Sequence, residues 1–156
     1  AAAKIPVANL RRGIRALEVI EKTGELFSTQ PQPPAKNDFL IIGLTTHRPV
    51  LYQRINQRVD QMVANGLLEE AKWLYGQGGE NEQAGKGIGY RELFPYFAGT
   101  VSRQEALEKI KLDSRHYAKR QLTWFRNQMT VHWFDLVSQQ NTTEEIEALI
   151  NGWLKK

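Results

Sequence analysis

The sequence predicts an α/β chain that is mostly helical, with about two strands of an incomplete parallel sheet. One unbroken apolar run, Phe39 to Leu44, is typical of a strand buried on both faces, as in parallel sheets. A second candidate strand lies at 131–135, and the other segments carry apolar residues at helical spacing. Because two strands do not make a stable sheet alone, we expect strands from outside this sequence to complete it.

The composition is that of a folded globular protein. Of the 156 residues, 41% are hydrophobic and 24% are charged, so the chain can bury a core. No apolar run approaches the roughly 18 residues that span a bilayer, and no secretory signal is visible. The absence of cysteine excludes disulfides and thiolate metal sites, and three scattered histidines do not favour a histidine cage. We expect a cytoplasmic protein without membrane contact.

The first element is a helix predicted at 10–22. Asn9 can cap its start, and Gly24 ends it. Residues 28–37 are rich in proline and polar side chains, which excludes helix and predicts an exposed loop. The apolar strand follows at 38–45. The chain also opens without Met and almost directly with this helix, which favours a piece of a longer protein.

The middle of the chain is predicted to be helical with one long loop. A helix at 49–65 carries apolar residues along one side, and Gly66 separates it from a helix at 67–75. Residues 76–89 are rich in glycine and polar residues and are predicted to form a loop, either a mobile one or one that wraps a ligand. A short helix is expected near 91–97.

The longest helix is predicted at 103–126. Ser102 can cap it, and Glu105, three residues on, completes a capping box. A last helix opens at Thr142 or Thr143.

The long helix carries the positive charge of the chain. Residues 103–126 contain seven Lys or Arg and three acids, a net charge of +4 that equals the charge of the whole chain. A local basic face usually binds a polyanion. The alternative is a basic face that is simply exposed to solvent. Four cations form a stripe on a helical wheel: Lys111, Arg115, Lys119 and Arg126. We interpret the neighbouring Trp124 and Phe125 as core residues.

Three other patterns were tested for chemistry. Arg58 borders the apolar face of its helix, and a partly buried arginine needs a phosphate or carboxylate partner. A ligand phosphate and an internal ion pair are both open as that partner. Asp60 lies on the wrong side of the helix to provide the carboxylate. Glu18 follows Arg15 by three residues on the same predicted helix, a spacing at which the two side chains can form an ion pair. Gly85-Lys86 lacks the following Ser or Thr of a Walker loop. No motif forms a complete active site, so no catalytic residue or metal ligand is predicted.

Six blocks of sequence follow one another in a recognisable order. They are Ala1–Ile5, Arg12–Val19, Leu51–Val59, Gly66–Glu70, Gly87–Leu93 and Tyr117–Arg126. Together they resemble the tRNA dimethylallyltransferase family, also called tRNA isopentenyltransferases. The resemblance implies a P-loop-NTPase-like α/β fold, of which this chain is the carboxy-terminal half. Residues 1–37 would end a helical insertion and include the Pro-rich loop, and residues 38–156 would belong to the catalytic core with its tRNA-contacting helices.

The resemblance also implies a reaction and its partners. The family transfers a dimethylallyl group from dimethylallyl diphosphate to N6 of the adenosine 3′ of the anticodon. Its P-loop, its general base and the ligands of its Mg²⁺ belong to the amino-terminal half, which we expect as a partner of this chain. The chain alone is therefore expected to be inactive; a stand-alone RNA-binding module without catalysis is the alternative.

Site residues follow from the matching positions. Arg58 corresponds to an arginine that helps hold the substrate diphosphate. Contacts to the tRNA anticodon stem-loop are implied for Arg11, Arg12, Arg15, Lys86, Tyr90, Arg91, Lys119, Arg120, Gln121 and Arg126. The first of these segments departs from the family, because Arg11-Arg12 replaces a common Gln-Arg pair.

Overall fold

The computed structural model describes residues 10–27, 29 and 38–155. The chain divides into two compact units, Ala1–Phe39 and Leu40–Lys156. The proposed cap Asn9 and nearly all of the proline-rich segment 28–37 lie outside the described residues. Among the described helices, none is both long and apolar enough to cross a membrane.

The first unit contains the predicted helix α1, Leu10–Thr23. Gly24 ends it with a φ of +72°, a left-handed conformation that favours glycine. Ala16 is buried, whereas Leu10 and Leu17 are exposed. The predicted pair of Arg15 with Glu18 is confirmed, with 3.0 Å between Nη1 and Oε2.

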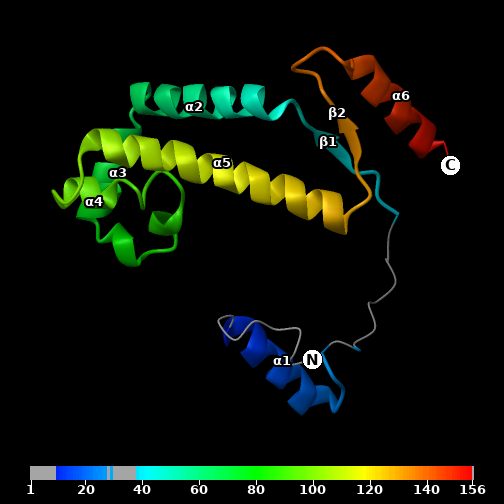
Figure 1. The fold of residues 1–156 in the computed structure, drawn as a ribbon, viewed down its shortest axis with the longest axis horizontal. Helices are drawn as coiled ribbons and strands as arrows, with labels where there is room; N and C mark the ends of the chain where they lie inside the picture. Colours follow the sequence, from blue (N-terminus) through cyan, green and yellow to red (C-terminus); the bar gives the residue numbers. More distant parts are fainter. Residues whose placement is uncertain (1–9, 28, 30–37, 156) are drawn as a thin grey trace. The chain divides into compact units, whose positions relative to one another are not determined.

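The second unit consists of helices and a two-stranded sheet, which lies near one end of its longest helix (Figure 1). Its α-helices are α2 (Arg48–Ala64), α3 (Leu67–Gly76), α4 (Phe94–Phe97), α5 (Arg103–Gln128) and α6 (Thr143–Leu154). The glycine-rich segment forms two 3₁₀ turns, η2 (Gly79–Asn81) and η3 (Ala84–Lys86). The predicted order of helices is confirmed, although α4 starts later than expected.

Local sequence explains where these helices begin. Gly66 separates α2 from α3 with a φ of +101°. The predicted capping box of α5 is present: Glu105 N–H donates to Ser102 Oγ at 3.2 Å, and Ser102 N–H donates to Glu105 Oε2 at 2.7 Å. Thr142 and Glu145 form a second capping box at the start of α6. Each box satisfies backbone donors that a helix start leaves free.

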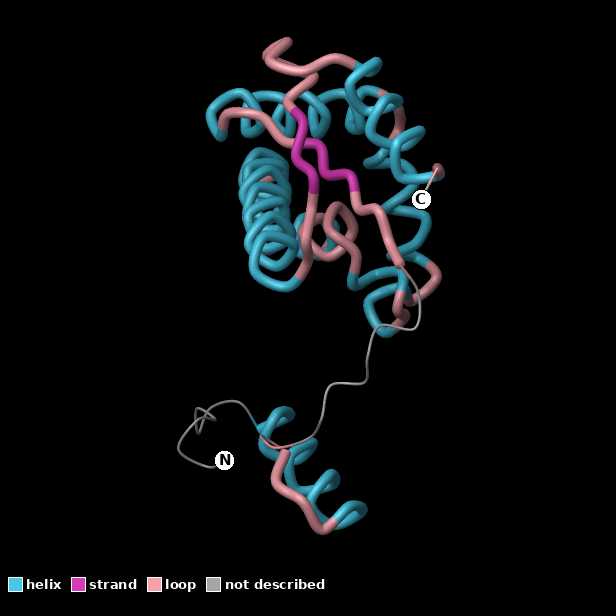
Figure 2. The backbone as a smooth tube through the Cα atoms, turned by 90° about the vertical axis from the view of Figure 1, so that its right-hand side faces the viewer, coloured by secondary structure: helices cyan, strands magenta, loops and turns pink. Residues whose placement is uncertain are grey.

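The two predicted strands pair in parallel, as β1 (Ile42–Leu44) and β2 (His132–Phe134) (Figure 2). Gly43 lies opposite Trp133, and a Cβ at this position would come within 2.6 Å of the indole ring. The expectation that the first strand is buried on both faces is wrong for this chain. Leu44 is 64% exposed, because the described sheet has one neighbouring strand and leaves much of β1 uncovered.

The core lies where α2, α3 and α5 meet. Its buried side chains are Val59, Leu67, Ala71, Leu93, Ala106 and Ile110. Helices α2 and α5 lie side by side over much of their length (Figure 1). The interpretation of Trp124 as a core residue is wrong: it is 51% exposed and stacks edge-on against the partly buried Phe125. The hollow beside Trp124 is lined by residues of α5, so no other described element covers this side of the ring.

Candidate functional site: a cationic groove between two helices

A groove of about 700 Å³ lies between α2, α5 and residues 86–91. Apolar side chains such as Ile55, Val59 and Ile110 form part of its lining. Its four cations are Arg58, Lys86, Arg91 and Arg120. Among the described residues, no acidic side chain lines this Arg58 groove, so its potential is positive and suits an anionic ligand.

Arg58 itself is exposed, which corrects the expected half-buried placement. Within the described residues it has no hydrogen-bond or ion-pair partner. Asp60 instead pairs with Lys111 of α5, with 2.9 Å between Oδ1 and Nζ. The alternative of an internal ion pair for Arg58 is therefore not realised, and its guanidinium is available to a ligand in the groove.

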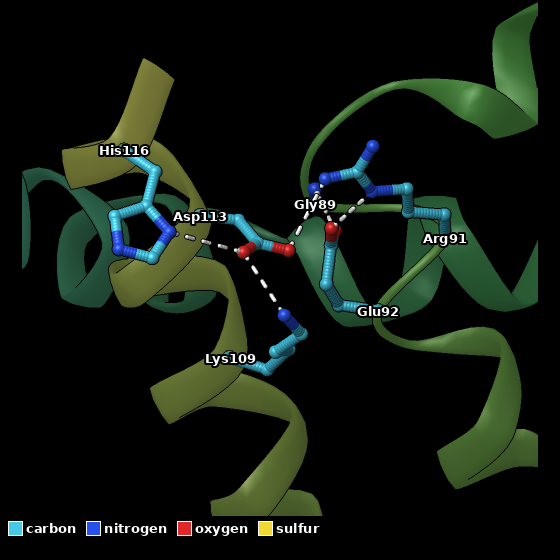
Figure 3. Close-up of polar contacts among 6 residues, drawn as sticks. All are labelled: Gly89, Arg91, Glu92, Lys109, Asp113 and His116. Carbon is cyan, nitrogen blue, oxygen red and sulfur yellow. Dashed lines mark hydrogen bonds and ion pairs between the residues drawn. The ribbon is translucent and has the colours of Figure 1, made fainter. Parts of the chain in front are cut away.

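The segment between η3 and α4 is held by a buried carboxylate (Figure 3). Glu92 has a side chain that is only 2% exposed. Its Oε2 accepts the N–H of Gly89 at 2.7 Å, and its Oε1 accepts Nε of Arg91. Gly89 has a φ of +109°, so the turn that brings its N–H to Glu92 requires glycine. One carboxylate thus fixes the backbone and the arginine of this turn.

Asp113 of α5 joins this arrangement from the opposite side (Figure 3). Its carboxylate accepts Arg91 Nη2 at 3.1 Å and Lys109 Nζ at 3.0 Å, and His116 Nδ1 lies 4.0 Å away. Partial burial opposes its ionisation, but the hydrogen bonds from Lys109 and Arg91 outweigh it and hold the pKa of Asp113 below its ordinary value. Arg91 is therefore a link between the turn and α5.

Tyr90 is likewise occupied within the protein. Its hydroxyl donates to Glu70 Oε1 of α3 at 2.7 Å, and this hydrogen bond is the main reason that the pKa of Tyr90 is raised. Its ring packs against the core. The structure thus gives Tyr90 and Arg91 a positioning role within the turn, and their predicted contacts to RNA stay predictions.

The basic stripe predicted on α5 is divided into two parts. Lys111 pairs with Asp60 and with Glu108, and Arg115 Nη1 donates to Asn56 Oδ1 at 2.7 Å. The hydrogen bond to Asp60 is the main cause of the raised pKa of Lys111. These two cations therefore fasten α5 to α2.

The later cations of α5 are exposed and have no acidic partner among the described residues. The guanidinium of Arg120 lies 5.9 Å from the centre of the Tyr117 ring, and that of Arg126 lies 5.5 Å from the Trp133 ring. Such contacts orient a cation without neutralising it. Gln121 lies between them in sequence and lines the Arg58 groove, while Lys119 lines two neighbouring hollows.

Three of the predicted RNA contacts lie on the first helix. Arg11 is exposed, Arg15 pairs with Glu18, and the side chain of Arg12 lies outside the described residues. These residues belong to the other compact unit. Their predicted contacts to RNA remain predictions.

Sequence reasoning missed Glu92, Asp113 and Asn56. Lys109 and Asp113 stand four residues apart on a helix, which is a pairing signal that sequence offers. The pairing of Asp113 with Arg91, however, joins different elements and has no local signature. Among the described residues, no group of three or more His, Cys, Asp or Glu is placed to hold a metal ion.

Comparison with known proteins decides the family. A sequence profile of the IPP transferase family matches residues 1–128. The chain belongs to this family. It is 97% identical over its whole length to a tRNA dimethylallyltransferase of Limosilactobacillus fermentum, and 67% identical to one of Limosilactobacillus reuteri. It covers 51% of each, so it spans about half the length of these curated relatives.

Solved IPP transferase structures have the same fold. A tRNA Δ(2)-isopentenylpyrophosphate transferase of Staphylococcus epidermidis matches 97% of this chain with a TM-score of 0.71 and 42% identity, and 51% of that protein is covered. A full-length tRNA isopentenylpyrophosphate transferase of Bacillus halodurans matches 99% of the chain with a TM-score of 0.71 and 44% identity, and 47% of that protein is covered. The resemblance inferred from the six sequence blocks is confirmed.

Proposed function

We propose that this chain is the part of a tRNA dimethylallyltransferase that holds the tRNA and contributes one arginine to the diphosphate site. The names of its relatives support tRNA prenylation. The observation that carries the assignment to this chain is the acid-free Arg58 groove, whose central arginine has no partner within the described residues. In this proposal the complete enzyme has a P-loop-like α/β core that the amino-terminal half completes.

The reaction is a substitution at an allylic carbon. N6 of the adenosine that follows the anticodon attacks C1 of dimethylallyl diphosphate, the C1–O bond breaks, and pyrophosphate leaves with the bonding electrons. The nitrogen then loses a proton to a base in the other half. Arg58 donates hydrogen bonds to the diphosphate, and it stabilises the charge that grows there as the bond breaks. Mg²⁺ is assigned to the amino-terminal half, and no step of this chain runs through it.

The anticodon stem-loop is the second ligand. Lys86 and Arg120 line the Arg58 groove, and Lys119 and Arg126 extend the positive surface along α5. Cations without acidic partners release counterions when they meet phosphates, which makes the affinity fall as salt rises. Arg91 and Tyr90 act mainly by holding the turn of Gly89 in place.

Activity requires both halves in this proposal. The chain alone binds RNA but does not transfer the prenyl group, and the complete enzyme works on tRNA in the cytoplasm. A stand-alone RNA-binding module is not favoured, because the relatives over the whole chain are named as transferases.

Replacement of Arg58 tests the proposed function. Arg58→Ala in the complete enzyme removes charge-assisted hydrogen bonds worth about 1.5–3 kcal/mol, so the KM for dimethylallyl diphosphate should rise about 10- to 100-fold. The KM for tRNA should change by less than about twofold. Arg54→Ala is the matched control, because Arg54 lies one turn away and is exposed. A variant that weakens tRNA more than the diphosphate would remove the assignment.

A further inference from the structure

A second positive hollow lies beside the sheet, at the carboxyl end of β1. It has a volume of about 260 Å³, and its cations are Arg48 of α2 and Lys119 and Arg126 of α5. We name it the Arg48 hollow. Within the part of the chain that the structure describes, no acidic side chain lines it, and it shares only Leu51 with the lining of the Arg58 groove. Figure 1 shows that α2 follows β1 in the chain, and Arg48 is the first residue of α2.

The three cations of the Arg48 hollow are not neutralised within the described part of the chain. Arg48 and Lys119 are exposed, and neither side chain has a hydrogen-bond or ion-pair partner there. Arg126 rests over the Trp133 ring, which fixes its direction and leaves its charge unpaired. Like charges that line one hollow repel one another, so binding of an anion stabilises the arrangement.

The segment between β1 and Arg48 is held by β2 and the loop after it. Thr45 N–H donates to the carbonyl of Phe134 at 2.9 Å, and the hydroxyls of Thr46 and Ser138 share a hydrogen bond of 3.0 Å. The loop after β2 is ordered in turn by buried Asp135, whose Oδ1 accepts the N–H of Ser138 at 2.8 Å. Thr46 and His47, which line the hollow, therefore follow the carboxyl end of β1 and are tied by hydrogen bonds to β2 and the loop after it. Open α/β sheets bind their ligands at this end of their strands.

We propose that Arg48, Lys119 and Arg126 form a binding site for backbone phosphates of the RNA, separate from the diphosphate position at Arg58. The new member is Arg48, which brings α2 into the RNA surface. Lys119 and Arg126 stand about two turns, or roughly 10 Å, apart along the axis of α5. This spacing suits successive phosphates of a strand better than one diphosphate group. The inference rests on the proposed function, because it takes the RNA that α5 binds as the ligand.

Replacement of Arg48 in the complete enzyme tests the inference. The affinity for an anticodon stem-loop RNA is measured over a range of NaCl concentrations, together with the KM for dimethylallyl diphosphate. For Arg48→Ala we expect an affinity loss of about 5- to 10-fold at low salt and a salt slope smaller by about 0.7–0.9, the loss of one phosphate contact. The KM for the diphosphate should stay within about twofold, and Arg48→Lys should keep the slope.

Control variants separate this inference from the proposed function. Arg54→Ala removes an exposed arginine from the same helix and should leave the slope unchanged. An Arg48→Ala enzyme with unchanged RNA affinity and slope overturns the Arg48 site alone. A raised KM for the diphosphate with intact RNA binding overturns it as well, because the hollow would then serve the donor. A wild-type enzyme that binds no RNA overturns the proposed function and this inference together.

Discussion

The two halves of α5 carry the same kind of charge and use it differently. Between residues 109 and 116, Lys109, Lys111 and Arg115 all have polar partners in the protein, and the first two form ion pairs. Between residues 119 and 126, the described residues provide no acid for Lys119, Arg120 or Arg126. Asp113 is the last acidic residue in the sequence of α5, so the cations that follow it have no acid nearby on their own helix.

In the proposed function, one helix thus both holds the fold together and presents the RNA-binding surface. In the first half, Lys111 and Arg115 join α5 to α2, and the carboxylate of Asp113 joins it to Arg91 in the turn of Glu92. Cations in the second half have no ion pair that must be broken before they bind phosphates, and this is the role proposed for them. The boundary between the halves lies beside Tyr117 and Ala118, where the Arg58 groove opens.

Loss of the Glu92 carboxylate should have the largest effect on stability. Glu92→Ala leaves the Gly89 N–H and part of the Arg91 guanidinium without an acceptor, so unfolding should become easier by about 3 kcal/mol. Urea denaturation measures this change, with exposed Glu82→Ala as the control. A loss below about 0.5 kcal/mol, as for an ordinary surface site, would show that the first half of α5 does not depend on this turn.

Acid should weaken the same region through Asp113. Its folded pKa lies below its ordinary value of 3.8, so its ion pairs contribute stability that is complete above that value. The contribution is lost as the pH falls below 3.8 toward the folded pKa. Asp113→Asn should therefore flatten the decline of the free energy of unfolding over this range. A wild type and a variant with parallel acid profiles would contradict the pairing.

Helix boundaries and strand positions could be predicted because their signals are local. Gly66 and the Ser102–Glu105 capping box mark helix starts through residues only a few positions apart. Each strand was marked by its own short run of apolar residues. Their pairing with one another followed because the sequence offers no other candidate strand.

The environments of single side chains were harder to predict. Periodicity assigned Trp124 and Phe125 to one apolar side, but it does not show where a covering element ends, and Trp124 is exposed. The half-buried placement of Arg58 failed for the same reason. The division of the basic stripe depends on Asp60 and Asn56, which α2 brings to α5 from about 50 residues away. Such partners follow from packing and are not visible in spacing.

The salt dependence of RNA binding tests the division of α5 most directly. Two triple variants of the complete enzyme are compared with wild type on an anticodon stem-loop, one neutralising Lys119, Arg120 and Arg126, the other Lys109, Lys111 and Arg115. We expect the first variant to lose about two units of salt slope, at roughly 0.7 per phosphate contact, and to keep its stability. The second should lose stability and keep the slope. Equal losses of slope in both variants would contradict the account.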